Sequence, residues 1–225
     1  MDLPEITIVS LFSGREKILE GWLHHLMEID YQKDKLHLVW HTNSESMLFV
    51  NVLKQMKSKI GDSYASIKFH HNTEIPESVM AFEEKNFKYS ILHAEIIAAL
   101  YNRAMEDVPN TEYVFFLEDD VLCPSHCLKR LLATYKTLPA MFDRHSPNIF
   151  HHNFFIGSLR KDAEVTEEDR AIAYPCSKMW GVREIKLCHL GITLFKKQIM
   201  DAHIPDPWFH PVHDNPAYKE IIGCD

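Results

Sequence analysis

Short apolar runs alternate with segments of helical periodicity through the first half of the chain. The runs are rich in β-branched residues, lack a helical repeat and predict buried strands at 6–12, 36–40 and 65–69. Between them, apolar residues recur at three- and four-residue steps and predict helices at 16–29, with Ser13 as the N-cap, and at 47–60. Strands and helices that alternate in this order form a parallel sheet with right-handed crossovers.

The alternation continues into the middle of the chain. A helix is predicted at 91–105, and the stretch at 113–117 (YVFFL), the most hydrophobic in the sequence, predicts a central strand covered on both faces. A further helix is predicted at 125–135. Beyond it the pattern weakens to strand-like runs at 148–156 and 187–195, and the segments predicted as loops are 70–89, 160–169 and 203–216.

These elements predict an α/β fold with a mostly parallel central sheet flanked by helices and a Rossmann-like N-terminal half. The 225 residues contain no repeat and no linker, so a single domain over 1–225 is expected.

Composition excludes several classes of function. The seven glycines are too sparse for a G-x-G-x-x-G or a G-x-x-x-x-G-K-[ST] motif, so glycine-loop dinucleotide and phosphate sites are excluded. A net charge of −8 disfavours a nucleic-acid partner, since phosphate binding needs clustered Lys and Arg. The five cysteines are odd in number and form no C-x-x-C, which predicts reduced thiols. No leader or membrane-spanning run is found, and a cytoplasmic location is expected.

Three adjacent carboxylates, Glu118, Asp119 and Asp120, follow the predicted central strand. Ligands of open α/β sheets bind beyond the carboxyl ends of the strands, and adjacent buried carboxylates need a compensating cation or hydrogen-bond donors. Because residues i and i+2 of a strand share a face, Glu118 and Asp120 are expected to point into one site and hold Mg²⁺ or Mn²⁺. The alternative is a solvated acidic turn.

The order of four segments resembles the nucleotide-sugar glycosyltransferases of the GT-A fold. The segments are ITIVSLFSGREKILEGWLHHL (6–26), LHLVWHTNSES (36–46), YNRAMEDVPNTEYVFFLEDDVLCP (101–124) and HLGITLFKKQIM (189–200). The sequence is most similar to the broad family 2 group, and partly to the collagen galactosyltransferase and Golgi mannosyltransferase groups. The resemblance implies a nucleotide-binding half at 1–125 and an acceptor half at 126–225.

The resemblance also implies roles for individual residues. The acidic triplet becomes the D-x-D element, in which Asp120 holds the metal and Glu118 or Asp119 meets the ribose. The remaining donor-binding residues are expected to be Leu11, Ser13, Arg15, Thr42, Asn43 and Asn102. Thr42 and Asn43 stand where the family usually has an acidic residue near the base, which leaves the identity of the base open. Asn102 has an alternative role as part of a helix cap.

The catalytic base and the last metal ligand are expected in the C-terminal third. The resemblance makes Asp225, after Gly223, the candidate base that deprotonates the acceptor hydroxyl, with Asp214 as the alternative because the family's helix continues beyond this motif. His213 or His189 could complete the metal sphere, whereas the spacing in this histidine-rich region does not favour a dedicated zinc site. Aromatic residues that could stack on a sugar or fill the core are Trp180, Trp208 and Phe209.

The resemblance implies a metal-dependent glycosyltransferase that moves a sugar from a nucleotide-diphosphate sugar, a UDP- or GDP-sugar, to an acceptor hydroxyl. The acceptor would be a glycan, a protein or a small molecule, and the cofactor Mn²⁺ or Mg²⁺. Two alternatives stay open. One is a nucleotidyltransferase with a similar sheet, and the other is a non-catalytic module that binds a nucleotide-sugar or a glycan.

Overall fold

A computed structural model describes residues 3–77, 91–137, 149–151, 191–203 and 209. Its centre is a six-stranded sheet in the order β3-β2-β1-β4-β6-β5. The parallel strands are β1 (Ile6–Phe12), β2 (Leu36–Thr42), β3 (Ser66–His71) and β4 (Tyr113–Leu117). Strand β6 (Ile192–Lys196) pairs antiparallel with β4, and β5 (Ile149–His151) pairs antiparallel with β6. The predicted α/β fold with a mostly parallel sheet is therefore confirmed.

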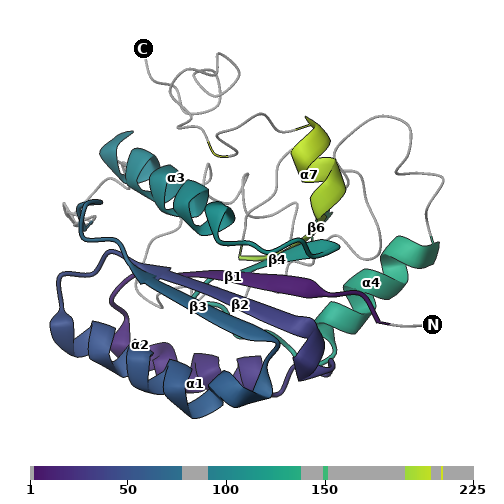
Figure 1. Cartoon of the computed structure of the whole chain (residues 1–225), viewed down its shortest axis with the longest axis horizontal. Helices are drawn as coiled ribbons and strands as arrows, with labels where there is room; N and C mark the ends of the chain where they lie inside the picture. The colour runs from purple at the N-terminus through teal and green to yellow at the C-terminus, as the bar shows by residue number, and fades with distance from the viewer. Residues whose placement is uncertain (1–2, 78–90, 138–148, 152–190, 204–208, 210–225) are drawn as a thin grey trace, which may run out of the picture.

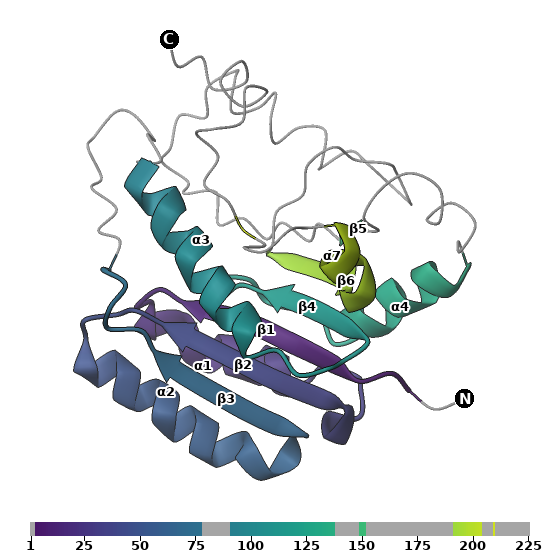
Figure 2. The same ribbon diagram turned by 45° about the horizontal axis from the view of Figure 1, so that its top comes forward.

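Helices cover both faces of this sheet (Figures 1 and 2). Helices α1 (Glu16–Met27) and α2 (Met47–Ile60) lie together on one face, and α3 (Ile91–Glu106) and α7 (Lys197–His203) lie on the other. Helix α4 (Cys127–Thr137) adds apolar side chains to the cluster that α1 and α2 form with the sheet. Two short 3-10 turns, Lys33–Lys35 and Gly61–Ser63, precede β2 and β3.

The apolar core is divided by the sheet into two layers. All seven residues of β1 and all five of β4 are buried, because both strands are covered by helices on both faces. On the α1 and α2 side, Phe12, Trp22 and Trp40 pack edge to face, with ring centroids 4.9 to 5.8 Å apart. This packing fixes the end of β1, where the following loop begins.

Most predicted elements are confirmed, with shifted ends. The strand at 6–12, the helix at 47–60 and the strand at 113–117 have the predicted bounds, whereas β2 continues two residues further, through Thr42. The N-cap prediction is wrong, because α1 has Arg15 at its N-cap position and the Ser13 hydroxyl instead binds Asp119. The predicted loops at 160–169 and most of 203–216 lie outside the described residues, as does most of the predicted strand at 148–156.

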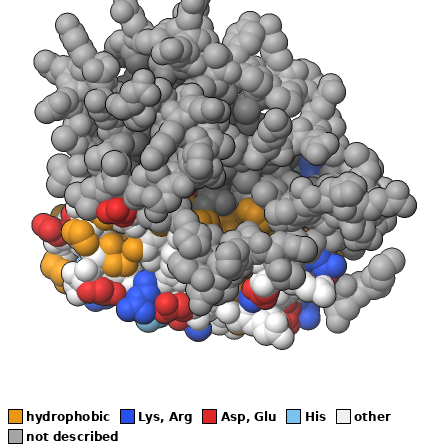
Figure 3. All heavy atoms as spheres, turned by 90° about the horizontal axis from the view of Figure 1, so that it is seen from above, with side chains coloured by type: hydrophobic (Ala, Val, Ile, Leu, Met, Phe, Trp, Pro, Cys, Tyr) orange, Lys and Arg blue, Asp and Glu red, His pale blue; other side chains and the backbone are white. Residues whose placement is uncertain are grey.

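The described surface is of mixed charge. In Figure 3, acidic and basic side chains are interspersed on the part of that face that is coloured, and hydrophobic side chains are visible at its left end and again near the centre of the view. Large apolar side chains that are exposed among the described residues are Ile18, Met27, Met47 and Leu48. Within the described part of the chain, no helix combines the length and the apolar character needed to cross a membrane.

Candidate nucleotide-sugar site

The strand order places one crevice at the carboxyl edge of the sheet. From β1, the chain adds β2 and β3 on one side and β4 on the other, so the strand order reverses between β1 and β4. Ligands of open α/β sheets bind beyond the strand ends at such a switch point. The loop that follows β1 and the acidic triplet that follows β4 meet there, which brings together two segments that the sequence analysis assigned to the donor.

Asp119 is the acid that joins these two segments. Its side chain is 4% exposed, and its carboxylate accepts hydrogen bonds from the Ser13 backbone N–H at 2.8 Å and the Ser13 hydroxyl at 3.0 Å. Arg15 Nη1 adds a contact of 3.3 Å. Burial raises the pKa of Asp119, while the hydrogen bond from the Ser13 backbone and the charge of Arg15 oppose this rise. Asp119 thus fixes the loop after β1 against the end of β4.

Asp120 is the accessible acid of the triplet. Its side chain is 43% exposed and forms an ion pair with Arg15, which therefore bridges Asp119 and Asp120. Strand β4 ends at Leu117, and one guanidinium group reaches both aspartates because the chain is already turning. Because the Asp120 side chain is exposed, a ligand could replace Arg15 as its partner.

Glu118 lies half-buried between the sheet and α3. The Tyr101 hydroxyl donates to its Oε1 at 3.4 Å, and its backbone carbonyl accepts from Trp22 Nε1 at 3.0 Å. Burial, followed by the charges of Asp120 and Asp119, raises the pKa of Glu118 to about 7. On its other side, the chain passes close by at Gly191, where a Cβ would lie 3.5 Å from Glu118 Oε2, an ordinary contact distance. A cation nearby would stabilise the ionised form of Glu118, which burial and the neighbouring charges disfavour.

The carboxylates fit a magnesium or manganese ion that also binds substrate. Such ions are commonly held by one or two carboxylates together with substrate phosphates. Asp120 and Glu118 could supply these oxygens. In the described ranges, no three His, Cys, Asp or Glu side chains are arranged to hold a metal ion by themselves. His213, the third predicted ligand, lies outside the described residues, as do His189, Asp214, Asp225, Trp180 and Trp208.

The turn after β2 lies beside the loop that follows β1. Thr42 donates from its hydroxyl to the Phe12 carbonyl at 2.8 Å, and Asn43 donates from Nδ2 to the Pro76 carbonyl at 2.6 Å. Both side chains are buried and bind the protein's own backbone. Next to them, the Glu77 carboxylate accepts from the Ser44 hydroxyl at 3.3 Å and from the Glu45 backbone N–H at 2.8 Å. Sequence reasoning missed Glu77 because it lies in a segment without periodicity.

Asn102 and Leu11 contact protein atoms. Asn102 Nδ2 donates to the Phe209 carbonyl, and its Oδ1 accepts from the Phe209 backbone N–H, both at 2.9 Å. The Phe209 ring stacks on Tyr101 with centroids 4.9 Å apart and meets Phe116 edge to face, so this aromatic residue fills the core. Leu11 is buried in the same apolar layer.

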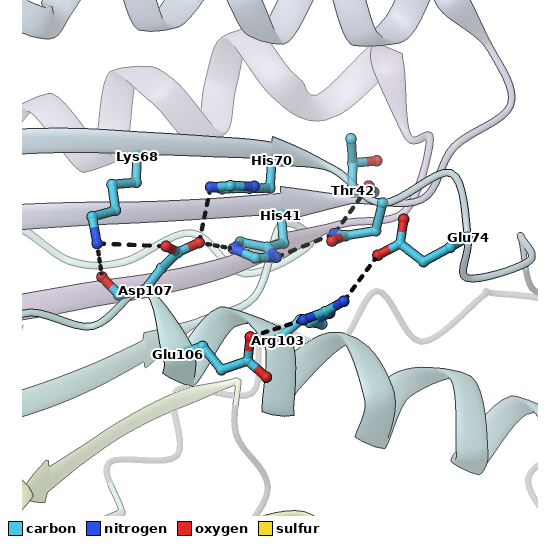
Figure 4. A network of polar contacts seen from close by, with 9 residues as sticks. His41, Thr42, Lys68, His70, Glu74, Arg103, Glu106 and Asp107 are labelled. Atoms are coloured by element: carbon cyan, nitrogen blue, oxygen red, sulfur yellow. Dashed lines mark hydrogen bonds and ion pairs between the residues drawn. The ribbon is translucent and has the colours of Figure 1, made fainter.

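A second polar network lies on the α3 face, beyond the end of α3 (Figure 4). Asp107 Oδ2 lies 3.0 Å from His41 Nε2 and 3.1 Å from His70 Nε2, and His41 Nδ1 lies 3.1 Å from Asn72 Nδ2. Burial lowers the pKa of His41, and the hydrogen bond and charge of Asp107 oppose this. The network borders a cavity of about 230 Å³ that Arg103 also lines. Strand alternation could have placed His41 in the sequence analysis. Residues two apart on a strand share a face, and His41 comes two residues after Val39, which is buried in the apolar layer that also contains α3 residues.

Fold and site together define a GT-A-like sheet with a carboxylate cluster at its switch point, the class predicted from the sequence. No family model matches the chain. In sequence it is similar to a protein of Drosophila pseudoobscura pseudoobscura described as "Glycosyltransferase 25 family member", at 24% identity over 97% of this chain and 37% of that protein. A Drosophila melanogaster protein of the same description is 26% identical over 68% of this chain and 25% of its own length. The chain thus spans well under half of each relative.

A solved structure supports the fold. The mannosyltransferase PcManGT from Pyrobaculum calidifontis, in complex with GDP-Man and Mn²⁺, matches 88% of this chain and 46% of its own chain, with a TM-score of 0.53 and 14% sequence identity. The resemblance to glycosyltransferases indicated by the sequence motifs is therefore confirmed in sequence relatives and in fold.

Proposed function

We propose that this chain is the catalytic domain of a metal-dependent glycosyltransferase that moves a sugar from a nucleotide-diphosphate sugar to an acceptor hydroxyl. The observation that carries the proposal is the carboxylate cluster of Glu118, Asp119 and Asp120 at the switch point, fixed by Ser13 and Arg15 from the loop after β1. The glycosyltransferase relatives support the same reaction class.

Each of the three carboxylates has a different role in binding the donor. Asp119 holds the loop after β1 in place, and Asp120 and Glu118 supply the oxygens for Mn²⁺ or Mg²⁺. When bound, such an ion neutralises charge that develops on the leaving diphosphate. Arg15, 38% exposed beside Asp120, is placed to exchange its carboxylate partner for a donor phosphate oxygen. Asp225 remains the proposed base for the acceptor hydroxyl, and Asp214 the alternative.

The test is calorimetric titration of the chain with UDP and GDP, with and without Mn²⁺. We expect binding that requires the metal, and we expect Asp120→Ala to abolish it while the far-ultraviolet circular dichroism stays unchanged. Asp62→Ala, which removes an exposed acid from the turn before β3, is the matched control and should bind as the wild type does. Metal-independent binding, or equal binding by Asp120→Ala, would contradict the metal assignment.

Product analysis separates the alternatives. Incubation of the chain with a UDP- or GDP-sugar and Mn²⁺ should release the nucleoside diphosphate, in water alone slowly and with an acceptor faster. Release of pyrophosphate from a nucleoside triphosphate and a sugar phosphate would identify a nucleotidyltransferase instead. Tight binding without release of any product would identify a binding module.

A further inference from the structure

Three separate parts of the fold hold Glu118. Trp22 of α1 donates from Nε1 to the Glu118 backbone carbonyl at 3.0 Å, and the Glu118 backbone N–H donates to the carbonyl of Gly191, just before β6, at 3.1 Å. At the far end of the side chain, the hydroxyl of Tyr101 in α3 donates to Oε1 at 3.4 Å. The two backbone bonds fix where the side chain begins, and the Tyr101 hydroxyl acts on the carboxylate itself.

Tyr101 is in turn fixed by its neighbours. It is 4% exposed, the Phe209 ring stacks on it with centroids 4.9 Å apart, and the Phe116 ring of β4 meets it edge to face at 5.5 Å. Asn102, the next residue of α3, holds Phe209 through two hydrogen bonds of 2.9 Å to the Phe209 backbone. A ring packed between two others in a dense core has little freedom to turn, so the position of the Tyr101 hydroxyl is set by the fold.

A hydrogen bond to one oxygen of a carboxylate fixes the other oxygen as well. The last torsion of a glutamate side chain is broad, and a partner at Oε1 narrows it, which gives the whole carboxylate of Glu118 one direction. Residues that orient metal ligands in this way are typically worth 10- to 100-fold in metal affinity. The contact of 3.4 Å suits a partner of the ionised acid, because hydroxyl bonds to a charged carboxylate shorten to about 2.5 to 2.7 Å.

We infer that Tyr101 is a positioning residue of the metal site, whose hydroxyl orients the Glu118 carboxylate toward the divalent cation that accompanies the donor. The inference rests on the proposed function and deepens it. Tyr101 acts through Glu118 and not on the reacting atoms. Asn102, which the sequence resemblance assigned to the donor, then contributes indirectly, because it holds the ring that stacks on Tyr101.

The experiment measures the affinity of Mn²⁺ for wild type and Tyr101→Phe, in the presence of UDP and separately of GDP, from the electron paramagnetic resonance signal of free Mn²⁺. The phenylalanine keeps the stacked ring and removes only the hydroxyl. We expect Mn²⁺ to bind the variant about 10- to 100-fold more weakly. Tyr64→Phe is the matched control and should bind Mn²⁺ as the wild type does, because it removes a buried hydroxyl whose bond, to the Leu26 carbonyl, is also 3.4 Å long.

Two further measurements separate positioning from loss of structure. Urea unfolding in the presence of a chelator should show similar losses of stability for the two tyrosine variants, so that a difference in Mn²⁺ affinity cannot come from folding. In a Glu118→Gln background, Tyr101→Phe should have little further effect on the Mn²⁺ affinity, since residues that act as a unit are not additive.

Each outcome has a distinct meaning. If Mn²⁺ binds the wild type with neither nucleotide, the proposed function fails and the role of Tyr101 fails with it. If Mn²⁺ binds the wild type and Tyr101→Phe equally, or if Tyr64→Phe weakens binding as much as Tyr101→Phe does, the assignment of Tyr101 is wrong while the proposed function stands. The full effect of Tyr101→Phe in the Glu118→Gln background would likewise show that Tyr101 does not act through Glu118.

Discussion

Replacing Glu118 by glutamine should stabilise the protein without metal at alkaline pH. The pKa of Glu118 is raised from 4.5 to about 7, first by burial and then by the charges of Asp120 and Asp119. Between these two values the folded state holds a proton that the unfolded state has released, so the stability of the wild type falls as the pH rises through this window. A glutamine has no proton to lose and keeps an oxygen for the Tyr101 hydroxyl.

The size of the effect follows from the same pKa values. A rise from 4.5 to about 7 corresponds to roughly 3 kcal/mol of unfolding free energy once the carboxylate is fully ionised. We therefore expect Glu118→Gln to exceed the wild type by about 2 to 3 kcal/mol at pH 8 and to match it at pH 4. Such a gain on removing a charged side chain is characteristic of sites where function costs stability.

The assay is urea unfolding in the presence of a chelator, at intervals from pH 4 to pH 8. The exposed Glu20→Gln in α1 is the control and should show no comparable pH-dependent difference. Adding Mn²⁺ at pH 8 should reduce the difference in unfolding free energy between Glu118→Gln and the wild type, because a bound cation stabilises the ionised Glu118. A difference that is the same at pH 4 and pH 8, or a variant less stable than the wild type at pH 8, would refute the reasoning.

Three further changes test the described contacts. Asp119→Ala should lower the unfolding free energy by about 1 to 3 kcal/mol through lost hydrogen bonds to Ser13, measured by urea unfolding, whereas the exposed Asp120→Ala should cost under about 1 kcal/mol. Burial lowers the pKa of His41, so stability should fall as the pH drops below 6.5, and His41→Gln should flatten that acid limb of the pH-stability curve. Gly14→Ala should lose about 1 to 2 kcal/mol at its positive φ, whereas Gly21→Ala, inside α1 with open space, should gain about 0.5 to 1 kcal/mol in the same assay. Equal stability of the two aspartate variants, equal stability of the two glycine variants, or an acid limb that His41→Gln leaves unchanged would contradict the corresponding contact.

The fold could be predicted because its signals are local. The apolar stretch Tyr113–Leu117 fits a strand covered on both faces, and the repeats in 16–29 and 47–60 fit helices that each bury one side. The antiparallel pairing of β6 with β4 was not predicted, because it depends on how a distant segment returns to the sheet. Periodicity reports which residues are buried and says nothing of strand direction.

The acidic triplet could also be found in the sequence, but the state of each acid could not. Which carboxylate is buried depends on where the chain turns after Leu117 and on Ser13, a residue 106 positions away. The N-cap prediction for Ser13 failed for the same reason, since its hydroxyl has a distant partner that outcompetes the local one. Glu77 and Asp107 were missed because both act from segments between regular elements, where no repeat marks them.

Three adjacent acids reach three different chemical states because the surroundings of each differ. Asp119 accepts hydrogen bonds from Ser13 and lies beside Arg15, so its charge is compensated within the protein. Asp120 is exposed and held by a single guanidinium group that a phosphate could also attract. Glu118 is half-buried and meets its like-charged neighbours, so its ionised form is the one that a cation stabilises most. On the proposed function, metal binding and donor binding would be coupled through Arg15 and Glu118. A bound cation would favour the ionised form of Glu118, and a donor phosphate that draws Arg15 away would leave Asp120 free to ligate the ion.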